Sequence, residues 1–147
     1  MSAFKSILLA TDFGDASARA EEVACTMATR FGARLTLMHV WVLPTSAYSE
    51  SITLPIDRIE RAAREALDRA AARLRSVVPN LETHLICGDP SRSIVEAAEE
   101  RGHDLVVLGT HGRHGVPRFF LGSVAEKVVR SAAVPVLTVR GAAPHGS

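Results

Sequence analysis

The chain has 147 residues, of which 47% are hydrophobic and 22% charged, so it has the length and make-up of one globular domain. Its 17 basic and 16 acidic residues nearly cancel, which gives no electrostatic reason to expect a nucleic acid or a membrane surface as partner. No apolar run reaches transmembrane length and no signal peptide is visible, so we expect a cytoplasmic protein.

Strand-like and helical patterns alternate along the whole chain. Short, continuous apolar runs predict strands that are covered on both faces of a sheet. The segment Glu82–Cys87 alternates more between apolar and polar residues, so this strand is expected nearer an edge of the sheet. The expected strands are Ser6–Ala10, Leu35–Val42, Glu82–Cys87, Leu105–Leu108 and Pro135–Val139. Apolar residues at helical spacing predict the helices Ala16–Phe31, Asp57–Val77, a segment from Pro90 to about Gly102, and Val124–Ala132.

Turn and cap residues support the ends of these helices. Gly32 follows the first helix where a left-handed glycine belongs, and Asp89 precedes a proline at the start of the third. Ser123 is expected to cap the last helix. The segment 44–55, rich in serine and threonine, is expected to be a lid or linker, and 141–147 a disordered tail.

The order βαβαβαβαβ predicts a parallel sheet with helices on both faces and right-handed crossovers. Ligands of such sheets bind at the carboxyl ends of the strands. If the first and fourth strands are neighbours, Asp12 and the segment 109–123 face one crevice. Asp12 could be a ligand residue there, or it could simply cap the first helix, as Asp15 or Ser17 also could.

The segment Gly109–Ser123 is a glycine-rich loop between a strand and a helix, and it contains two arginines and two histidines. Gly109 and Gly112 would let the backbone approach a ligand closely, and Gly122 and Ser123 open a helix whose free N–H groups favour phosphate. The loop is neither a Walker A motif nor a dinucleotide fingerprint. The pattern therefore predicts a phosphate-binding loop of another type.

Two cysteines and several aromatic or basic residues have competing interpretations. Cys25 and Cys87 are expected to be buried free thiols. His111 and His114 lack a third metal ligand nearby, and together with Arg113 and Arg118 they are candidates for contacts with phosphate. His39 and Trp41 are expected to be packed residues rather than functional ones.

The spacing Gly109-x2-Gly112-x9-Gly122-Ser123 resembles the G-x2-G-x9-G-[ST] motif of nucleotide-binding universal stress proteins. Thr11-Asp12, Leu37–Val40, Gly88–Pro90 and the run from Gly122 to Leu137 are also similar to that family. The resemblance covers residues 4–140, and it implies one universal stress protein domain over residues 1–141 with 142–147 as a tail. It also implies a three-layer, Rossmann-like α/β/α sandwich of the adenine nucleotide alpha hydrolase-like type, with five parallel strands in the order 3-2-1-4-5.

The same resemblance implies the ligand and the assembly. ATP would bind with adenine near the second strand, the main chain at Val40 on the base, Asp12 by the ribose or adenine, and Mg²⁺ on the phosphates. The implied site residues are Ala10, Thr11, Asp12, Val40, Gly109, Thr110, Gly112, Arg113, Gly115, Gly122, Ser123 and Val124. A homodimer would form through the last strand, here Val136, Leu137, Thr138 and Val139.

Three functions remain open on the sequence. The first is a homodimeric stress-response or signalling module that binds ATP with little or slow hydrolysis, since no Walker lysine or clear base is present. The second is a slow ATPase or a phosphoryl or nucleotidyl transferase, in which Asp12 would orient metal or water and His111 or His114 would serve as acid or base. The third is an interaction module that binds no nucleotide.

Overall fold

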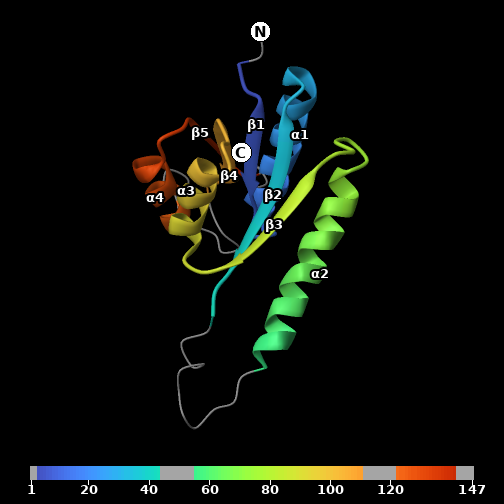
Figure 1. The fold of residues 1–147 in the computed structure, drawn as a ribbon, viewed down its shortest axis with the longest axis vertical. Helices are drawn as coiled ribbons and strands as arrows, with labels where there is room; N and C mark the ends of the chain where they lie inside the picture. Colours follow the sequence, from blue (N-terminus) through green and yellow to red (C-terminus); the bar gives the residue numbers. More distant parts are fainter. Residues whose placement is uncertain (1–2, 44–54, 111–121, 142–147) are drawn as a thin grey trace, which may run out of the picture.

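The computed structural model describes residues 3–43, 55–110 and 122–141. These residues form a five-stranded parallel sheet in the order β3-β2-β1-β4-β5, with helices on both faces (Figure 1). The strands are β1 (Ser6–Ala10), β2 (Arg34–Trp41), β3 (Glu82–Cys87), β4 (Leu105–Gly109) and β5 (Val136–Val139). The helices are α1 (Asp15–Phe31), α2 (Ile56–Leu74), α3 (Pro90–Glu100) and α4 (Ser123–Ser131). The predicted fold and strand order are confirmed.

Two apolar cores, one on each face of the sheet, hold the layers together. In β1, Ile7 and Leu9 pack with α1 and α2, whereas Leu8 and Ala10 pack with α3 and α4. Successive side chains of a strand point to opposite faces, so a strand covered on both sides needs apolar residues at every position. This burial explains the continuous apolar runs in the sequence.

The helix ends follow the predicted cap residues in α1 and α3. Gly32 ends α1 in the left-handed conformation, with φ of 64°. The Asp89 carboxylate accepts a hydrogen bond from the Arg92 N–H at the start of α3, and this bond lowers the pKa of Asp89. Pro90 occupies the first position of that helix, where no N–H is required.

Helix α2 ends at Leu74, three residues before the predicted end at Val77. Leu74 is the last buried residue of its apolar stripe, and the Val77 and Val78 N–H groups both donate to the Leu74 carbonyl in a turn. Val77 is 55% exposed. Val77 lies at helical spacing from Leu74 because the turn after the helix contains hydrogen bonds between residues three and four apart, as a helix does.

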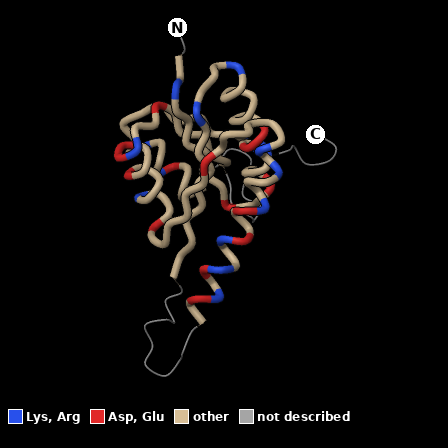
Figure 2. Tube along the Cα trace, turned by 45° about the vertical axis from the view of Figure 1, so that its right-hand side comes forward, with Lys and Arg blue, Asp and Glu red and all other residues tan. Residues whose placement is uncertain are grey.

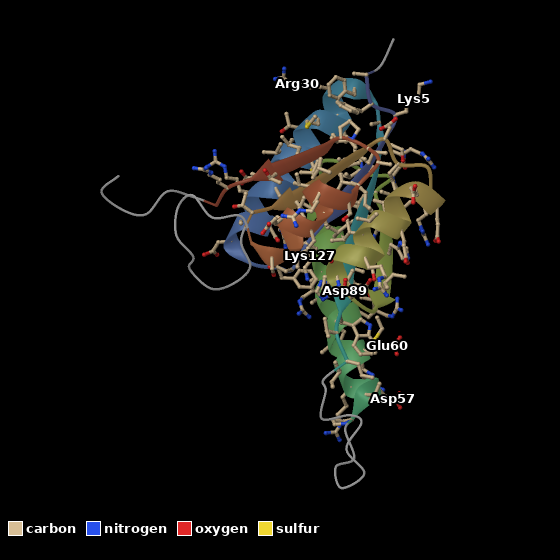
Figure 3. All side chains as sticks on the ribbon, turned by 90° about the vertical axis from the view of Figure 1, so that its left-hand side faces the viewer. Lys5, Arg30, Asp57, Glu60, Asp89 and Lys127 are labelled. Carbon is tan, nitrogen blue, oxygen red and sulfur yellow. The ribbon has the colours of Figure 1, made fainter. Side chains whose placement is uncertain are left out.

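The first half of α2 projects beyond the sheet, with Asp57 and Glu60 far from Lys5 and Arg30 at the opposite end of the molecule (Figures 1 and 3). Acidic and basic residues follow one another along this helix (Figure 2). Within the described ranges, no helix is long and apolar enough to cross a membrane. The charge along α2 accordingly marks a helix that borders on water.

The two cysteines are free, as expected, but only Cys25 is buried. The prediction that Cys87 is buried is wrong, because it is the last residue of β3, and β3 is an edge strand. Burial and the neighbouring Glu21 carboxylate raise the pKa of the Cys25 thiol. The edge position predicted for this strand is itself confirmed.

Candidate functional site

A cavity of about 220 Å³ opens at the carboxyl ends of β1, β2 and β4. The first residues of α3 and α4 close its sides. Every predicted site residue within the described part of the chain lines it: Ala10, Thr11, Asp12, Val40, Gly109, Thr110, Gly122, Ser123 and Val124. Gly112, Arg113 and Gly115, and the candidates His111, His114 and Arg118, lie outside the described residues.

The shared crevice follows from the strand order. β1 pairs with β4 along its length, and Ala10 lies opposite Leu108 in this register. The loop after β1 and the loop after β4 therefore leave the sheet side by side, and Asp12 and Thr110 reach one cavity. The expectation that Asp12 and the glycine loop face one crevice is confirmed for Gly109, Thr110, Gly122 and Ser123.

Sequence reasoning missed six residues that also line the cavity. These residues are Ser17, Met38, Pro90, Ile94, Leu108 and Ala125. Most of them are apolar, and in the sequence they count only as parts of strands or helices. One signal was available, because Met38 precedes Val40 by two residues and so shares its face of β2.

Asp12 is held in place by hydrogen bonds within its own loop. Its Oδ1 accepts from the Gly14 N–H at 2.8 Å and from the Ser17 hydroxyl at 2.7 Å. The Ser17 oxygen in turn accepts the Asp12 N–H at 3.1 Å. The prediction that Asp12 caps the first helix is wrong, because Gly14 occupies the N-cap position and no side chain of the described residues caps α1. The bonds to Gly14 and Ser17 instead join the carboxylate to the start of α1 and hold it at the cavity wall.

Phe13 adopts a backbone conformation that is rare for a bulky side chain. Its φ is +65°, in the left-handed region, and its N–H donates to the Thr11 hydroxyl oxygen at 3.0 Å. The rings of Phe13 and His39 lie with centroids 4.4 Å apart. The Nδ1–H of His39 donates to the Thr11 carbonyl at 2.8 Å. His39 thus holds the loop through its ring contact with Phe13 and its hydrogen bond to Thr11, in agreement with the packing role expected for it.

Gly109 has a packing reason to lack a side chain, in addition to the ligand approach predicted for it. A Cβ at this position would lie 2.8 Å from both the carbonyl carbon and the Cβ of Ala16. The glycine thus lets the first turn of α1 pack directly on the end of β4. Close approach of a ligand is not needed to explain this residue.

The start of α4 has no side-chain cap among the described residues. Gly122 occupies the N-cap position and Ser123 is the first helical residue, so the prediction that Ser123 is the N-cap is wrong. The Gly122 carbonyl accepts the first bond of the helix, from the Glu126 N–H, and the Gly122 N–H donates to the Thr110 carbonyl. No side chain caps this helix within the described residues, and Ser123 is exposed at the cavity. Among the described residues, its hydroxyl has no hydrogen-bond partner.

Thr110 lines the cavity and carries a buried hydroxyl that has no partner among the described residues. Thr110 is only 3% exposed, and its Oγ1 has no hydrogen-bond partner among the residues that the structure describes. A buried polar group left unsatisfied costs about 1–3 kcal/mol. A ligand oxygen at this point would remove that cost.

Charged groups are few at this cavity. Among the described lining residues Asp12 is the one titratable side chain. Lys127 of α4 and Asp89 at the start of α3 lie near each other, and Lys127 helps to lower the pKa of Asp89 (Figure 3). The described residues contain no group of three or more His, Cys, Asp or Glu side chains that could hold a metal ion.

The model of the universal stress protein family matches residues 3–140, and the chain belongs to that family. A universal stress protein of Thermus aquaticus, from the QAH/OAS sulfhydrylase 3′ region, is 37% identical over 142 residues. The match covers 93% of this chain and 99% of that relative.

Solved structures agree with this family membership. The universal stress protein UspA from Lactobacillus plantarum superimposes with a TM-score of 0.81 at 28% identity, over 95% of this chain and 100% of that one. A universal stress protein in complex with cAMP has a TM-score of 0.75 at 26% identity, over 96% and 100%. One from Archaeoglobus fulgidus in complex with dAMP has 0.65 at 28% identity, over 95% and 99%. Some structural neighbours therefore bind adenine nucleotides.

Proposed function

We propose that this chain binds an adenine nucleotide, ATP with Mg²⁺, in the cavity at the carboxyl ends of β1, β2 and β4. The observation that carries the proposal is the buried Thr110 hydroxyl, unpartnered among the described residues, beside the uncapped start of α4. Helix N-termini and hydroxyl donors suit phosphate oxygens. The structural neighbours with cAMP and dAMP support the choice of base.

The lining divides naturally between the parts of a nucleotide. Met38, Val40 and Ile94 offer an apolar wall for the base, with the Val40 main chain as its polar contact. Asp12 has Oδ2 free to accept from a ribose hydroxyl, because its described bonds use Oδ1. The phosphates would lie at Thr110 and Ser123. Mg²⁺ would be held mainly by phosphate oxygens, since Asp12 is the one carboxylate in the described lining.

The described residues favour holding ATP over hydrolysing it. General base catalysis needs a titratable group close to the phosphates that can take a proton. Asp12 is the one titratable side chain in the described lining, and its free Oδ2 is assigned to the ribose, so no described side chain is left for that role. We therefore propose little or slow hydrolysis. Phosphate release from ATP over several hours tests this point, and steady turnover abolished by Asp12→Ala with ATP binding intact would instead support the slow ATPase or transferase.

Calorimetric titration with ATP and Mg²⁺ tests the binding proposal. Thr110→Val keeps the shape of the side chain and removes the hydroxyl, so it should weaken ATP binding about tenfold while it leaves the free protein as stable or slightly more stable. Ser123→Ala should weaken binding as well, and Ser131→Ala at the exposed far end of α4 is the matched control. Absence of binding at millimolar ATP would refute the proposal and favour an interaction module.

We also propose that the protein works in the cytoplasm as a homodimeric stress-response module, paired through Val136, Leu137, Thr138 and Val139 of β5. This strand lies at one edge of the described sheet, with β4 on one side. An edge strand offers unpaired backbone groups to a second copy. Light scattering after size exclusion should give twice the monomer mass of 15.7 kDa, and a monomer mass at micromolar protein would contradict the dimer.

A further inference from the structure

A second cavity, also of about 220 Å³, lies between α1 and α2. Both helices pack on the face of the sheet opposite α3 and α4. The cavity is lined by Phe13, Gly14, Ala18, Glu21, Ala66, Arg69, Ala70 and Arg73. None of these residues lines the first cavity, so the two are separate spaces.

An ion pair between a buried carboxylate and a largely exposed guanidinium lies in the wall of this second cavity. Glu21 of α1 is 4% exposed, and its Oε2 accepts from the Arg73 Nη2 of α2 at 2.7 Å. Arg73 is 60% exposed, so most of its donors remain available. Arg69 also lines the cavity, and no carboxylate of the described chain lies within ion-pair distance of it. Because Glu21 offsets one of two guanidinium groups, the lining keeps an excess positive charge.

We propose that this second cavity binds a small organic carboxylate. The planar guanidinium groups of Arg69 and Arg73 match the two oxygens of a carboxylate. The rest of the wall is largely apolar, formed by Phe13, Ala18, Ala66 and Ala70, and it suits a carboxylate with a small apolar group attached. A cation is disfavoured, since Arg73 already neutralises the buried Glu21 carboxylate.

The loop between β1 and α1 connects the two cavities. Asp12 lines the first cavity and the adjoining Phe13 lines the second, and the Gly14 N–H holds the Asp12 carboxylate. Phe13 is kept at φ +65° by its bond to Thr11 and its contact with His39. A ligand against the Phe13 ring therefore bears on the position of Asp12. Occupancy of the second cavity changes nucleotide affinity at the first, a consequence that rests on the proposed function.

Titration of the ¹⁵N-labelled full-length protein with sodium benzoate tests the site. Saturable shifts are expected at the amides of Gly14 and Ala70, and they should be absent with sodium chloride at the same ionic strength. Arg69→Gln should weaken benzoate binding about tenfold, since one charge-assisted contact is lost. Arg61→Gln removes an exposed arginine of the same helix outside the cavity and should change nothing.

Two outcomes of the titration overturn the site: equal shifts in chloride, or equal affinity in Arg69→Gln and the native protein. Inorganic phosphate binding as tightly as benzoate would overturn the ligand class, because the apolar wall would contribute nothing. The link between cavities is tested by ATP titration with and without saturating benzoate, where about a fivefold change in affinity is expected. Unchanged ATP affinity overturns the link, whereas failure of ATP to bind refutes the proposed function and leaves the benzoate result standing.

Discussion

Substitution of Gly109 by alanine should displace the first turn of α1. The new Cβ would lie 2.8 Å from the carbonyl carbon and Cβ of Ala16, and 3.0 Å from the Ser17 nitrogen. Carbon atoms pack comfortably at about 3.5–4.0 Å, so the helix or the strand must move by roughly 0.5–1 Å. Backbone atoms cannot rotate away as a side chain can. Overpacking of this kind costs about 1–3 kcal/mol of unfolding free energy.

The same displacement should reach the candidate site. Ser17 sits on this first turn and holds Asp12 through a bond of 2.7 Å. A shift of about half an ångström stretches that bond toward the limit of hydrogen-bond geometry. Gly109→Ala should therefore lower both the stability measured by urea unfolding and the affinity for ATP measured by calorimetry.

Gly141→Ala is the matched control, because its Cβ would approach the same Ala16 residue no closer than 3.5 Å, an ordinary contact. Its effect on stability should stay within about 0.5 kcal/mol. In the double variant Gly109→Ala with Ala16→Gly, one of the two closest contacts disappears and the carbonyl carbon remains, so recovery should be partial. A neutral Gly109→Ala variant, or equal losses at Gly109 and Gly141, would refute the packing argument.

Three further results are expected. Burial and neighbouring positive charge lower the pKa of His103 and of His84 below 6.5, so the unfolded chain takes up protons before the folded protein does as the pH falls. The free energy of unfolding should therefore decrease below about pH 6.5, and it should decrease less in the double variant His84→Gln, His103→Gln. Equal pH profiles of the variant and the native protein would contradict this. A thiol reagent should modify exposed Cys87 in the folded protein and buried Cys25 only after unfolding, as mass spectrometry of the labelled peptides would show. Leu9→Ala, at a fully buried position, should cost about 2–5 kcal/mol in urea unfolding, and a loss below 1 kcal/mol would contradict the packing.

The fold could be predicted from the sequence because each strand carries its own signal. Continuous apolar runs such as Ser6–Ala10 report burial on both faces, and Asp89-Pro90 reports a helix start through local hydrogen bonding. The end of α2 was less visible, since a turn after Leu74 keeps helical spacing. The exposure of Cys87 depends on which strand has one neighbour, which is a property of the whole sheet.

The candidate site was visible where glycine and polar residues follow strands, and hidden where ordinary helix residues complete it. Ser17 could be read in the sequence as a cap residue of the first helix, but its bonds to Asp12 and its place in the cavity wall depend on the turn at Phe13. Ser123 has the right chemistry for an N-cap, but the first bond of the helix runs from the Glu126 N–H to the Gly122 carbonyl, so the helix begins one residue earlier than predicted. The second cavity exists because of the distance between α1 and α2, and no pattern in the sequence predicts that distance.

The projecting part of α2 has a consequence for local unfolding. From Ile56 to Ala66 no residue of this helix is buried, and the buried positions begin at Leu67. A short helical segment gains most of its stability from packing rather than from its own hydrogen bonds. Amide hydrogens before Leu67 should accordingly exchange with solvent through fraying, whereas those near Leu74 should exchange only when the sheet opens. One helix would then contain both some of the fastest and some of the slowest exchanging amides of the molecule.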